Sequence, residues 1–533
     1  MQSSLLRRLN YDVLVHVFEL LRLDGNLRAL SMTCRDIRQA CKPCLFRCTS
    51  ISAHRVVLLP PPPSDIWDYI RRLTVIGTWQ DVCDSHCDEQ LPQQFQRLLV
   101  QLLFRMPALE TVVIVACYFN GSLWDGIQTV LSCPQVRHLV LQVSPDRAVP
   151  IPPDFGSPRC TLASLTLPLE EYRCHPRNAI GEVALADSLV SNLAHSLEHL
   201  TMLLDVAPLA RMASLRLPRL RELHLKGDYP TAATDVSVPL LAVLSGMPNL
   251  RSLTLLRAVS GHKHREAYWR VEELDRFPCE HLEHLSIAYP EPTDELYSHL
   301  PTTLRSLTLR CYPRHYMHQH RHDRRTVEDE LRWTSPILKA SEMHTLLRRC
   351  QSRSLEELEI EYEEDAFDAT LLRSIASHFP NLRTLTIFRY RSRDNDDVPV
   401  ANVARALSSL AHLRVLRIHL DFQGTPHPLV CFMPRPNRKA VDGFEAHRKL
   451  LQSVANTFAA EAPPSLAYVC HLLRDYWANA WLPYRVERTD TGRATARLES
   501  DLLAVGRVRM EDDPGPATQY QRPIPDEFDD FEF

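Results

Sequence analysis

The stretch Leu-Arg-Thr-Leu-Thr-Ile at residues 382–387 is one copy of a six-residue pattern, L-x-x-L-x-L with other aliphatic residues allowed, that recurs along this chain. The last two apolar residues alternate with polar ones, so they predict a short strand with one face turned inward, and the first leucine leads into that strand. The pattern occurs twelve times, at Ile70, Leu73 and Val75; Leu109, Val112 and Ile114; Val136, Leu139 and Leu141; Leu162, Leu165 and Leu167; Leu197, Leu200 and Met202; Leu220, Leu223 and Leu225; Leu250, Leu253 and Leu255; Leu282, Leu285 and Ile287; Leu304, Leu307 and Leu309; Leu355, Leu358 and Ile360; Leu382, Leu385 and Ile387; and Leu413, Leu416 and Ile418. We therefore expect a repeat array rather than one compact core.

The segments between these blocks predict helices. Ahead of the 382–387 block, Leu371, Leu372, Ile375 and Phe379 recur at the three- and four-residue intervals of one apolar helical face. Units of helix, turn and strand stack into a parallel sheet on the concave side with helices on the convex side. The expected fold class is therefore an α/β solenoid, and block-to-block distances from 22 to 51 residues predict an irregular horseshoe with insertions.

The first fifty residues predict two or three short helices. Leu14, Val17, Phe18 and Leu21 lie on one helical face, and a break at residues 24–26, Asp-Gly-Asn, ends that segment. A second segment repeats the pattern with Leu27, Leu30, Cys34 and Ile37, and Asn26 is placed to cap its first turn. Helices this short bury little surface by themselves, so we expect apolar residues left over to pack on another chain.

This N-terminal order of residues resembles the F-box, and the twelve blocks resemble leucine-rich repeats, a combination found in fungal-type F-box proteins. The F-box usually has proline where Asn10 stands and often tryptophan where Ile37 stands. The resemblance implies binding to the Skp-type adaptor of a cullin-RING ubiquitin ligase. The residues that it implies for this contact are Leu9, Leu14, Val17, Phe18, Leu21, Leu27 and Leu30. The alternative is a helical N-terminal cap for the array.

The chain is thereby divided into five parts. We expect an F-box at residues 1–50, a linker leading into the array at 51–69, leucine-rich repeats at 70–430, a C-terminal cap at 431–500 and an acidic tail at 501–533. The apolar residues that predict the cap are Phe444, His447, Leu450, Leu451, Val454 and Phe458 on one helix, then 466–473, Trp477, Trp481 and Tyr484. From Glu511 onward eight acidic residues stand against Arg522 alone, so we expect the tail to be disordered.

Composition excludes several classes of function. A formal net charge of −4 shows no basic excess for nucleic acid, and no stretch approaches the roughly 18–20 continuous apolar residues of a membrane span. We expect neither nucleic acid nor membrane as a partner and a location in the cytoplasm or nucleus. The 15 cysteines lack the even, short spacings of a disulfide framework, which favours reduced thiols.

Three groups of histidine, cysteine or acidic residues have spacings that could form a metal-binding or catalytic site. His195, Glu198 and His199 match an H-x-x-E-H zinc motif, but they lead into a predicted strand, where four residues extend about 13 Å and cannot share one metal. His315, His318, His320 and His322 could bind a transition metal, but arginines surround them, which favours a solvated basic loop. The pairs Cys41 with Cys44 and Cys83 with Cys87 lack a second ligand pair. We therefore expect no catalytic site, no cofactor and no metal.

The polar positions of the strand blocks predict a recognition surface on the concave side. Glu357, Glu359 and Glu361 alternate along one strand and form an acidic ridge, with Arg310 and Phe388 beside it. An exposed ridge of this kind would select a basic segment of a target protein. The expected function is the substrate-recognition subunit of a ubiquitin ligase of the SCF type, and the alternative is a repeat scaffold that works without a ligase.

Overall fold

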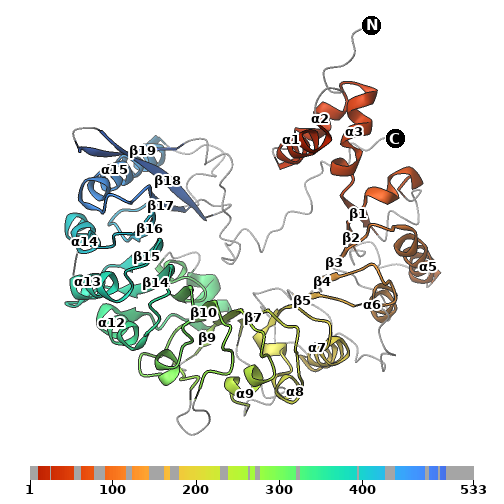
Figure 1. Ribbon diagram of the computed structural model, residues 1–533, viewed down its shortest axis with the longest axis horizontal. Helices are drawn as coiled ribbons and strands as arrows, with labels where there is room; N and C mark the ends of the chain where they lie inside the picture. The colour runs from red at the N-terminus through yellow and green to blue at the C-terminus, as the bar shows by residue number, and fades with distance from the viewer. Residues whose placement is uncertain are drawn as a thin grey trace. The chain divides into compact units, whose positions relative to one another are not determined.

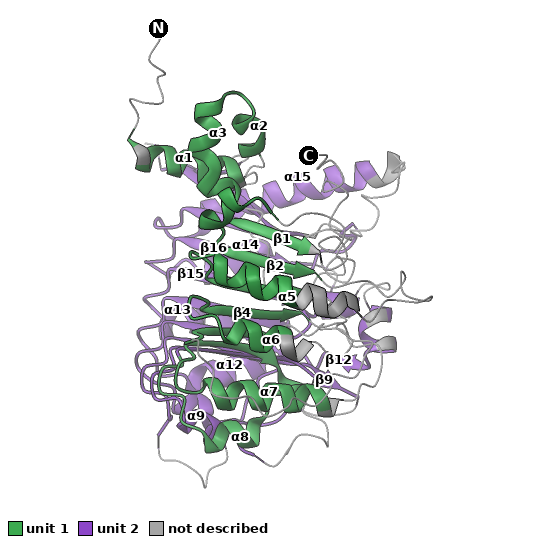
Figure 2. Cartoon of the chain, turned by 90° about the vertical axis from the view of Figure 1, so that its right-hand side faces the viewer, with its two compact units in different colours: residues 1–170, 175–220 green, residues 171–174, 221–533 purple. Residues whose placement is uncertain are grey.

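The computed structural model describes residues 10–23, 26–52, 62–76, 90–115, 123–142, 161–167, 179–228, 238–261, 265–269, 276–319, 324–392, 395, 397–426, 438–474, 479–489 and 492–499. The chain divides into two compact units, unit 1 with Met1–Glu170 and His175–Leu220, and unit 2 with Glu171–Cys174 and Arg221–Phe533 (Figure 2). Leu9, His320, His322, Cys83, Cys87, Trp477 and the acidic tail at 501–533 lie outside the described residues.

Unit 1 begins with three helices and continues as a parallel sheet. The helices are α1 (Tyr11–Leu23), α2 (Leu27–Ser31) and α3 (Arg35–Leu45). The strands, each parallel to the next, are β1 (Cys48–Ser52), β2 (Arg72–Ile76), β3 (Thr111–Val115), β4 (His138–Gln142), β5 (Ser164–Leu167) and β6 (His199–Leu203). Between and after them come η2 (Ser64–Tyr69), α5 (Gln90–Arg105), α6 (Leu123–Leu131), α7 (Ala179–Leu193), η4 (Leu204–Val206) and α8 (Leu209–Ser214). Helices α5, α6 and α7 lie on one side of the strands (Figure 1).

Unit 2 continues the same alternation. Its parallel strands are β7 (Glu222–Gly227), β8 (Ser252–Arg257), β10 (His284–Ala288), β11 (Ser306–Arg310), β14 (Glu357–Glu363), β15 (Thr384–Tyr390), β16 (Val415–Leu420) and β17 (Tyr468–Arg474). The helices between them are α9 (Leu240–Ser245), η5 (Glu295–Ser298), α12 (Ala340–Arg349), α13 (Asp368–His378), α14 (Val400–Ala406) and α15 (Arg438–Glu461). Helices α12, α13 and α14 cover one face of strands β14 to β16 (Figure 1).

The last two strands of unit 2 pair antiparallel with the strand before them. Strands β18 (Asn479–Arg488) and β19 (Ala494–Leu498) pair antiparallel, β18 with β17 and β19 with β18. Helix α15 buries Leu451, Val454 and Phe458, three of the six residues whose spacing predicted it, whereas Leu450 is 39% exposed. The described C-terminal region thus contains the expected amphipathic helix, joined by an antiparallel hairpin that the apolar count alone did not predict.

An insertion of residues 311–339 lies between β11 and α12. It contains α10 (Tyr316–Gln319), the π-helix η6 (Arg325–Glu330), β12 (Trp333–Thr334) and β13 (Leu338–Lys339). Strand β12 pairs antiparallel with β9 (Val259–Ser260), and β13 pairs with the end of β14. Strand β13 thereby joins the main sheet, whereas β12 and β9 form a separate two-stranded sheet.

The register of the strands confirms the block positions. Leu285 pairs with Leu307, Leu307 with Leu358, Leu358 with Leu385 and Leu385 with Leu416. All three apolar positions of every block are buried. Each unit is therefore a mixed α/β structure on a mostly parallel sheet, and among the described strands no pairing closes either sheet into a barrel.

A shared backbone contact explains why the register is so regular. The carbonyl of Arg305, just before β11, accepts hydrogen bonds from the amides of Glu356 and Glu357 at 2.8 and 2.9 Å. The carbonyls that accept from two consecutive amides of the next repeat in the same way belong to Arg47, Arg71, Glu110, Arg137, Ala163, Arg221, Arg251, Glu283, Glu356, Arg383 and Arg414. These amides and carbonyls at the strand starts are therefore satisfied without a particular side chain.

The sequence pattern missed two parallel strands that continue the array, β1 and β17. Residues 51–69 were expected to be a linker, but Ile51 belongs to β1, which pairs with β2 and follows α3 after two residues. Leu466, Val469 and His471 occupy block positions in β17, but the histidine in the third position hid the pattern. The array therefore starts earlier and ends later than its leucines indicate.

Within the described residues, no helix is both long and apolar enough to cross a membrane.

Candidate functional site

The three N-terminal helices form a core of their own. Leu14, Phe18 and Leu27 are buried in it, together with Cys41 and Cys44 of α3. Burial raises the pKa of the Cys41 thiol to about 11, so this thiol is protonated at neutral pH. These cysteines are interior residues of the helical core, as free thiols were expected to be.

The expected adaptor-binding residues are divided by this core. Leu14, Phe18 and Leu27 were expected on a docking surface, but in the structure they are buried where α1, α2 and α3 pack together. Leu21 and Leu30 are partly buried against the same cluster. The expected surface position of Leu14, Phe18 and Leu27 is therefore corrected to the core, whereas the expected adaptor contacts of Leu21 and Leu30 remain predictions.

A second apolar face of α1 is exposed. Val13, Val17 and Leu20 follow the i, i+4, i+7 spacing of one helical stripe and are 49%, 39% and 51% exposed. Met32, in the turn before α3, is 64% exposed. We call Val13, Val17 and Leu20 the α1 stripe. Of these three residues, only Val17 was expected from the sequence. The helical spacing of Val13 and Leu20 relative to Val17 could have identified them as well.

The predicted acidic ridge is not an open surface. Glu357 is exposed, but Glu361, Arg310 and Phe388 are buried, with exposed fractions of 2%, 5% and 0%, and Glu359 is only partly exposed. The insertion covers them, because its apolar residues pack onto the face of β15 and β17 that is opposite the strand leucines. The buried residues of this second core include Tyr312, Tyr316, Met317, Val327 and Trp333 from the insertion with Phe388, Tyr390 and Leu472 from the sheet.

Arg314 of the insertion occupies the ridge. Its guanidinium pairs with Glu361 at 3.1 Å and with Glu359 at 2.5 Å, and it lies 4.3 Å from the centre of the Phe388 ring. Burial by itself would raise the pKa of Glu359, but Arg314 and Arg310 outweigh this effect and lower it. The carboxylates that were expected to receive a target are thus neutralised within the chain.

Glu361 is the centre of this network. Its carboxylate accepts hydrogen bonds from the amides of Cys311 and His315, at 2.9 and 2.8 Å, and from the Tyr390 hydroxyl at 2.9 Å. With Arg314, four donors satisfy a side chain that has almost no contact with solvent. A buried carboxylate is tolerated only with such partners.

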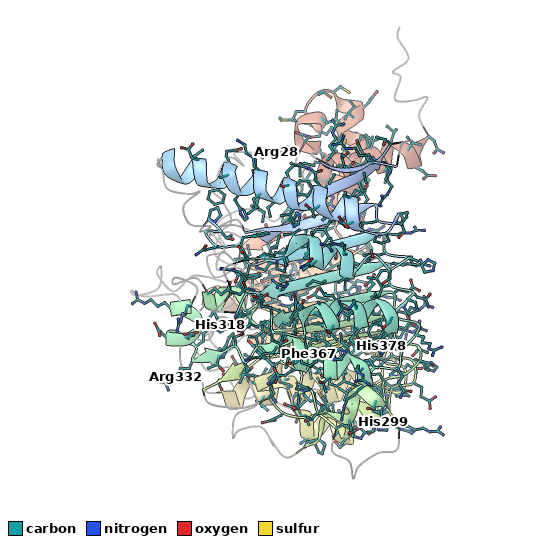
Figure 3. All side chains as sticks on the ribbon, turned by 90° about the vertical axis from the view of Figure 1, so that its left-hand side faces the viewer. Arg28, His299, His318, Arg332, Phe367 and His378 are labelled. Atoms are coloured by element: carbon teal, nitrogen blue, oxygen red, sulfur yellow. The ribbon has the colours of Figure 1, made fainter. Side chains whose placement is uncertain are left out.

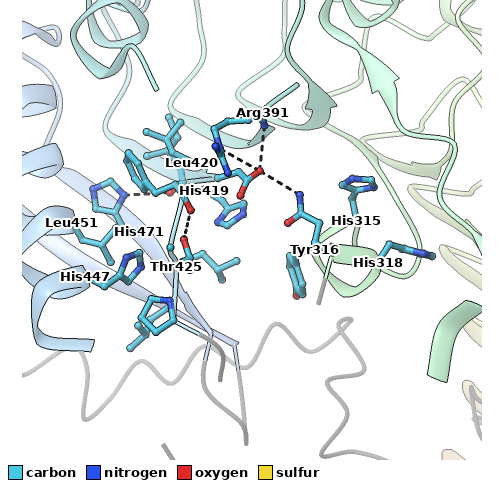
Figure 4. Close-up of a pocket in the computed structure, with 18 of the residues that line it drawn as sticks. His315, Tyr316, His318, Arg391, His419, Leu420, Thr425, His447, Leu451 and His471 are labelled. Carbon is cyan, nitrogen blue, oxygen red and sulfur yellow. Dashed lines mark hydrogen bonds and ion pairs between the residues drawn. The ribbon is translucent and has the colours of Figure 1, made fainter. Parts of the chain in front are cut away.

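A cavity of about 640 Å³ lies next to the Arg314 network in unit 2. Figure 4 shows His315 and Tyr316 of the insertion on one side and His447, Leu451 and His471 on the other. Asp421 bridges the two sides, because it accepts from the Gln319 amide at 3.4 Å and pairs with Arg391 at 3.7 Å. The cavity is within the range of 300–1,000 Å³ that is usual for ligand sites.

His315 and His318, the described histidines of the run, do not lie in the solvated basic loop that was expected. His318 is 8% exposed, with Nδ1 3.4 Å from a Glu328 carboxylate oxygen, and burial lowers its pKa. Burial also lowers the pKa of His315 to about 4. Figure 3 shows His318 and Arg332 of the same insertion on one side of unit 2. Among the described residues no group of three or more histidine, cysteine or acidic side chains is placed to hold a metal ion.

The H-x-x-E-H motif lies where the strand prediction placed it. His199 is the first residue of β6, and Glu198 pairs with Arg219 at 2.7 Å. His195 belongs to the turn between α7 and that strand. The three side chains are therefore spread along a turn and a strand start. A zinc site of this motif requires them on one helix.

The buried His471 predicts a pH dependence of stability. Burial lowers its pKa from 6.5 to about 4, so the unfolded chain binds a proton between these values and the folded chain does not. The corresponding stability is present above pH 6.5 and is lost as the pH falls toward 4. At pH 5 the loss is about 2 kcal/mol, since one pKa unit corresponds to about 1.4 kcal/mol.

Urea unfolding at pH 7 and pH 5 tests this dependence in the wild type and in His471→Asn. Asparagine retains a donor for the Ile418 carbonyl, which His471 Nδ1 contacts at 3.3 Å, but it cannot titrate. We expect the variant to lose about 2 kcal/mol less than the wild type between the two pH values. Equal losses would contradict the assignment of the titration to His471.

No protein-family model and no curated protein matches this chain. The described residues offer two surfaces that suit binding, the α1 stripe in unit 1 and the cavity in unit 2.

Proposed function

We propose that this chain is the substrate-recognition subunit of a cullin-RING ubiquitin ligase of the SCF type. Helices α1 to α3 bind the Skp-type adaptor, the repeats bind a target protein, and the other subunits supply the chemistry. The chain acts by proximity, because it raises the effective concentration of the target near the ubiquitin carrier. Such a subunit belongs in the cytoplasm or nucleus and needs no cofactor.

The observation that carries the proposal is the exposed α1 stripe. The three helices already close a core with Leu14, Phe18 and Leu27, so their fold does not require Val13, Val17 and Leu20. A row of apolar side chains that the fold does not use is typical of a surface for another protein. The resemblance of residues 9–38 to the F-box names the class of partner.

The link between the helices and the sheet supports this role. Helix α3 ends at Leu45 and β1 starts at Cys48. Lys42 pairs with Asp65 at 2.7 Å, and the Arg47 carbonyl accepts from the amides of Arg71 and Arg72. An adaptor on α1 would therefore be held at a set distance from the first strands of unit 1, which suits a subunit that works by positioning.

Adaptor binding by the full chain tests the proposal. Val17→Glu combined with Leu20→Glu places two charges in the α1 stripe without entering the core, and we expect copurification of a coexpressed Skp-type adaptor to be lost. The matched control is Phe104→Glu with Phe367→Glu, two apolar residues that are 52% and 48% exposed on other elements. This control should retain the adaptor.

Two results would count against the proposal. If the wild type captures no adaptor, the chain is better described as a repeat scaffold that works without a ligase, and its N-terminal helices cap the array. If the stripe variant is folded and captures as much adaptor as the wild type, the α1 stripe is not the docking surface. Circular dichroism of both double variants confirms that the helices are intact.

A further inference from the structure

The cavity in unit 2 has an uncompensated negative charge. Two arginines and three carboxylates line it. Arg324 pairs with Glu328 at 2.5 Å, and Arg391 pairs with Asp421 at 3.7 Å. The fifth group, Glu363, forms no side-chain hydrogen bond or ion pair with any of the described residues.

Four of the five histidines that line the cavity do not offset this charge at neutral pH. Burial lowers the pKa of His315, His318, His447 and His471, so these four imidazoles are uncharged there. Counted over its two arginines and three carboxylates, the lining therefore has one net negative charge, at Glu363, beside these four uncharged rings. A cationic group inside the cavity would be favoured over an anion or a neutral molecule of the same shape.

The neighbouring positions of the same strand show which cation such a site accepts. Glu359, Glu361 and Glu363 alternate along β14, so their side chains leave the same face of the sheet. The first two bind the guanidinium of Arg314, with Phe388 against its face. Glu363 is the next carboxylate in this row, and it lines the cavity.

We propose that this cavity binds an organic cation with N–H donors, a guanidinium or primary ammonium group, whose charge lies against Glu363 and whose hydrocarbon part lies along Leu451 and Leu472. The volume of about 640 Å³ exceeds that of a single ion and suits a cation with a hydrocarbon chain. The cation comes either from a free amine or from a lysine or arginine side chain of a partner protein. The proposal does not depend on binding to a ubiquitin ligase.

Calorimetric titration of the full chain with n-butylguanidinium tests the site. Butylurea is the matched neutral probe, because it has the same shape without the charge. We expect the cation to bind at least about tenfold more tightly than butylurea, and Glu363→Gln to weaken its binding about tenfold. The control is Glu357→Gln, on the same strand but exposed and outside the cavity lining, which should leave the affinity unchanged.

A second variant covers the case in which Glu363→Gln does not fold. Thr425 lies on the loop after β16 and lines the cavity, so Thr425→Trp fills the space without changing the charge. We expect it to abolish butylguanidinium binding. Equal affinities for the two probes, or unchanged binding in both folded cavity variants, would overturn the proposal.

Two further probes identify the source of the cation. N-acetyl-arginine methylamide represents a side chain of a partner protein, and spermidine represents a free amine. Whichever binds more tightly to the wild type, with loss of that binding in Glu363→Gln, identifies the class of natural ligand. Adaptor copurification is a separate measurement, so failure here leaves the test of the ligase proposal unaffected.

Discussion

Replacement of Arg314 with methionine should lower the free energy of unfolding by about 3–5 kcal/mol, the usual loss when one partner of a buried ion pair is removed. Arg314 is 1% exposed and pairs with two carboxylates, of which Glu361 is itself buried. Methionine fills much of the space but leaves the charge of Glu361 without its cation. Chemical denaturation measures the loss, and hydrogen exchange should show faster exchange in residues 311–319.

A matched control separates burial from pairing. Arg383 pairs with Glu356 at 3.5 Å, but its side chain is 62% exposed, so Arg383→Met should cost less than about 1 kcal/mol. A triple variant, Arg314→Met with Glu359→Gln and Glu361→Gln, removes the unpaired charges and should recover part of the loss. If Arg314→Met costs no more than Arg383→Met, the insertion is not held on the sheet by this network.

Truncation of a strand leucine should have the second large effect. Leu385 in β15 is fully buried between Leu358 and Leu416 of the neighbouring strands. Leu385→Ala leaves a cavity in a continuous apolar layer, so we expect a loss of about 2–5 kcal/mol in the free energy of unfolding. Leu223→Ala in β7 should behave in the same way, since Leu223 is equally buried.

The neighbour of Leu385 provides the control for this prediction. Thr384 is on the same strand and is partly exposed on the opposite face, so Thr384→Ala should cost less than about 1 kcal/mol. The leucine variants and Thr384→Ala are compared with the wild type by chemical denaturation under the same conditions. Losses below about 0.5 kcal/mol at both Leu223 and Leu385 would contradict the structure, because the register of every block depends on these leucines facing inward.

The N-terminal helices illustrate where prediction from sequence stops. Helix α1 has apolar residues on two sides, Leu14 and Phe18 on one and Val13, Val17 and Leu20 on the other. Their spacing shows that both stripes exist, but it does not show which of them α2 and α3 cover. That choice is made by contacts between helices, and it moved Leu14, Phe18 and Leu27 from the expected surface to the core.

The recognition ridge shows the same limit over a longer distance. The sequence correctly predicted that Glu359 and Glu361 alternate on the strand face opposite the buried Leu358 and Ile360. It did not predict that Arg314, 45 and 47 residues earlier in the chain, would lie on them. The histidines and arginines of the insertion indicated a solvated loop, whereas its tyrosines and Trp333 allow it to pack on Phe388 and Tyr390.

By itself, the sequence determined twelve of the parallel strands and their inward faces. A period of two fixes the direction of each side chain relative to its own backbone, and the hydrogen bonds that start each strand are made by backbone alone. The tertiary structure decided which outward faces remain open. Whether Glu361 is buried or Glu363 faces a cavity depends on a segment distant in sequence, since burial is determined by what the rest of the chain covers and not by the residue's own spacing.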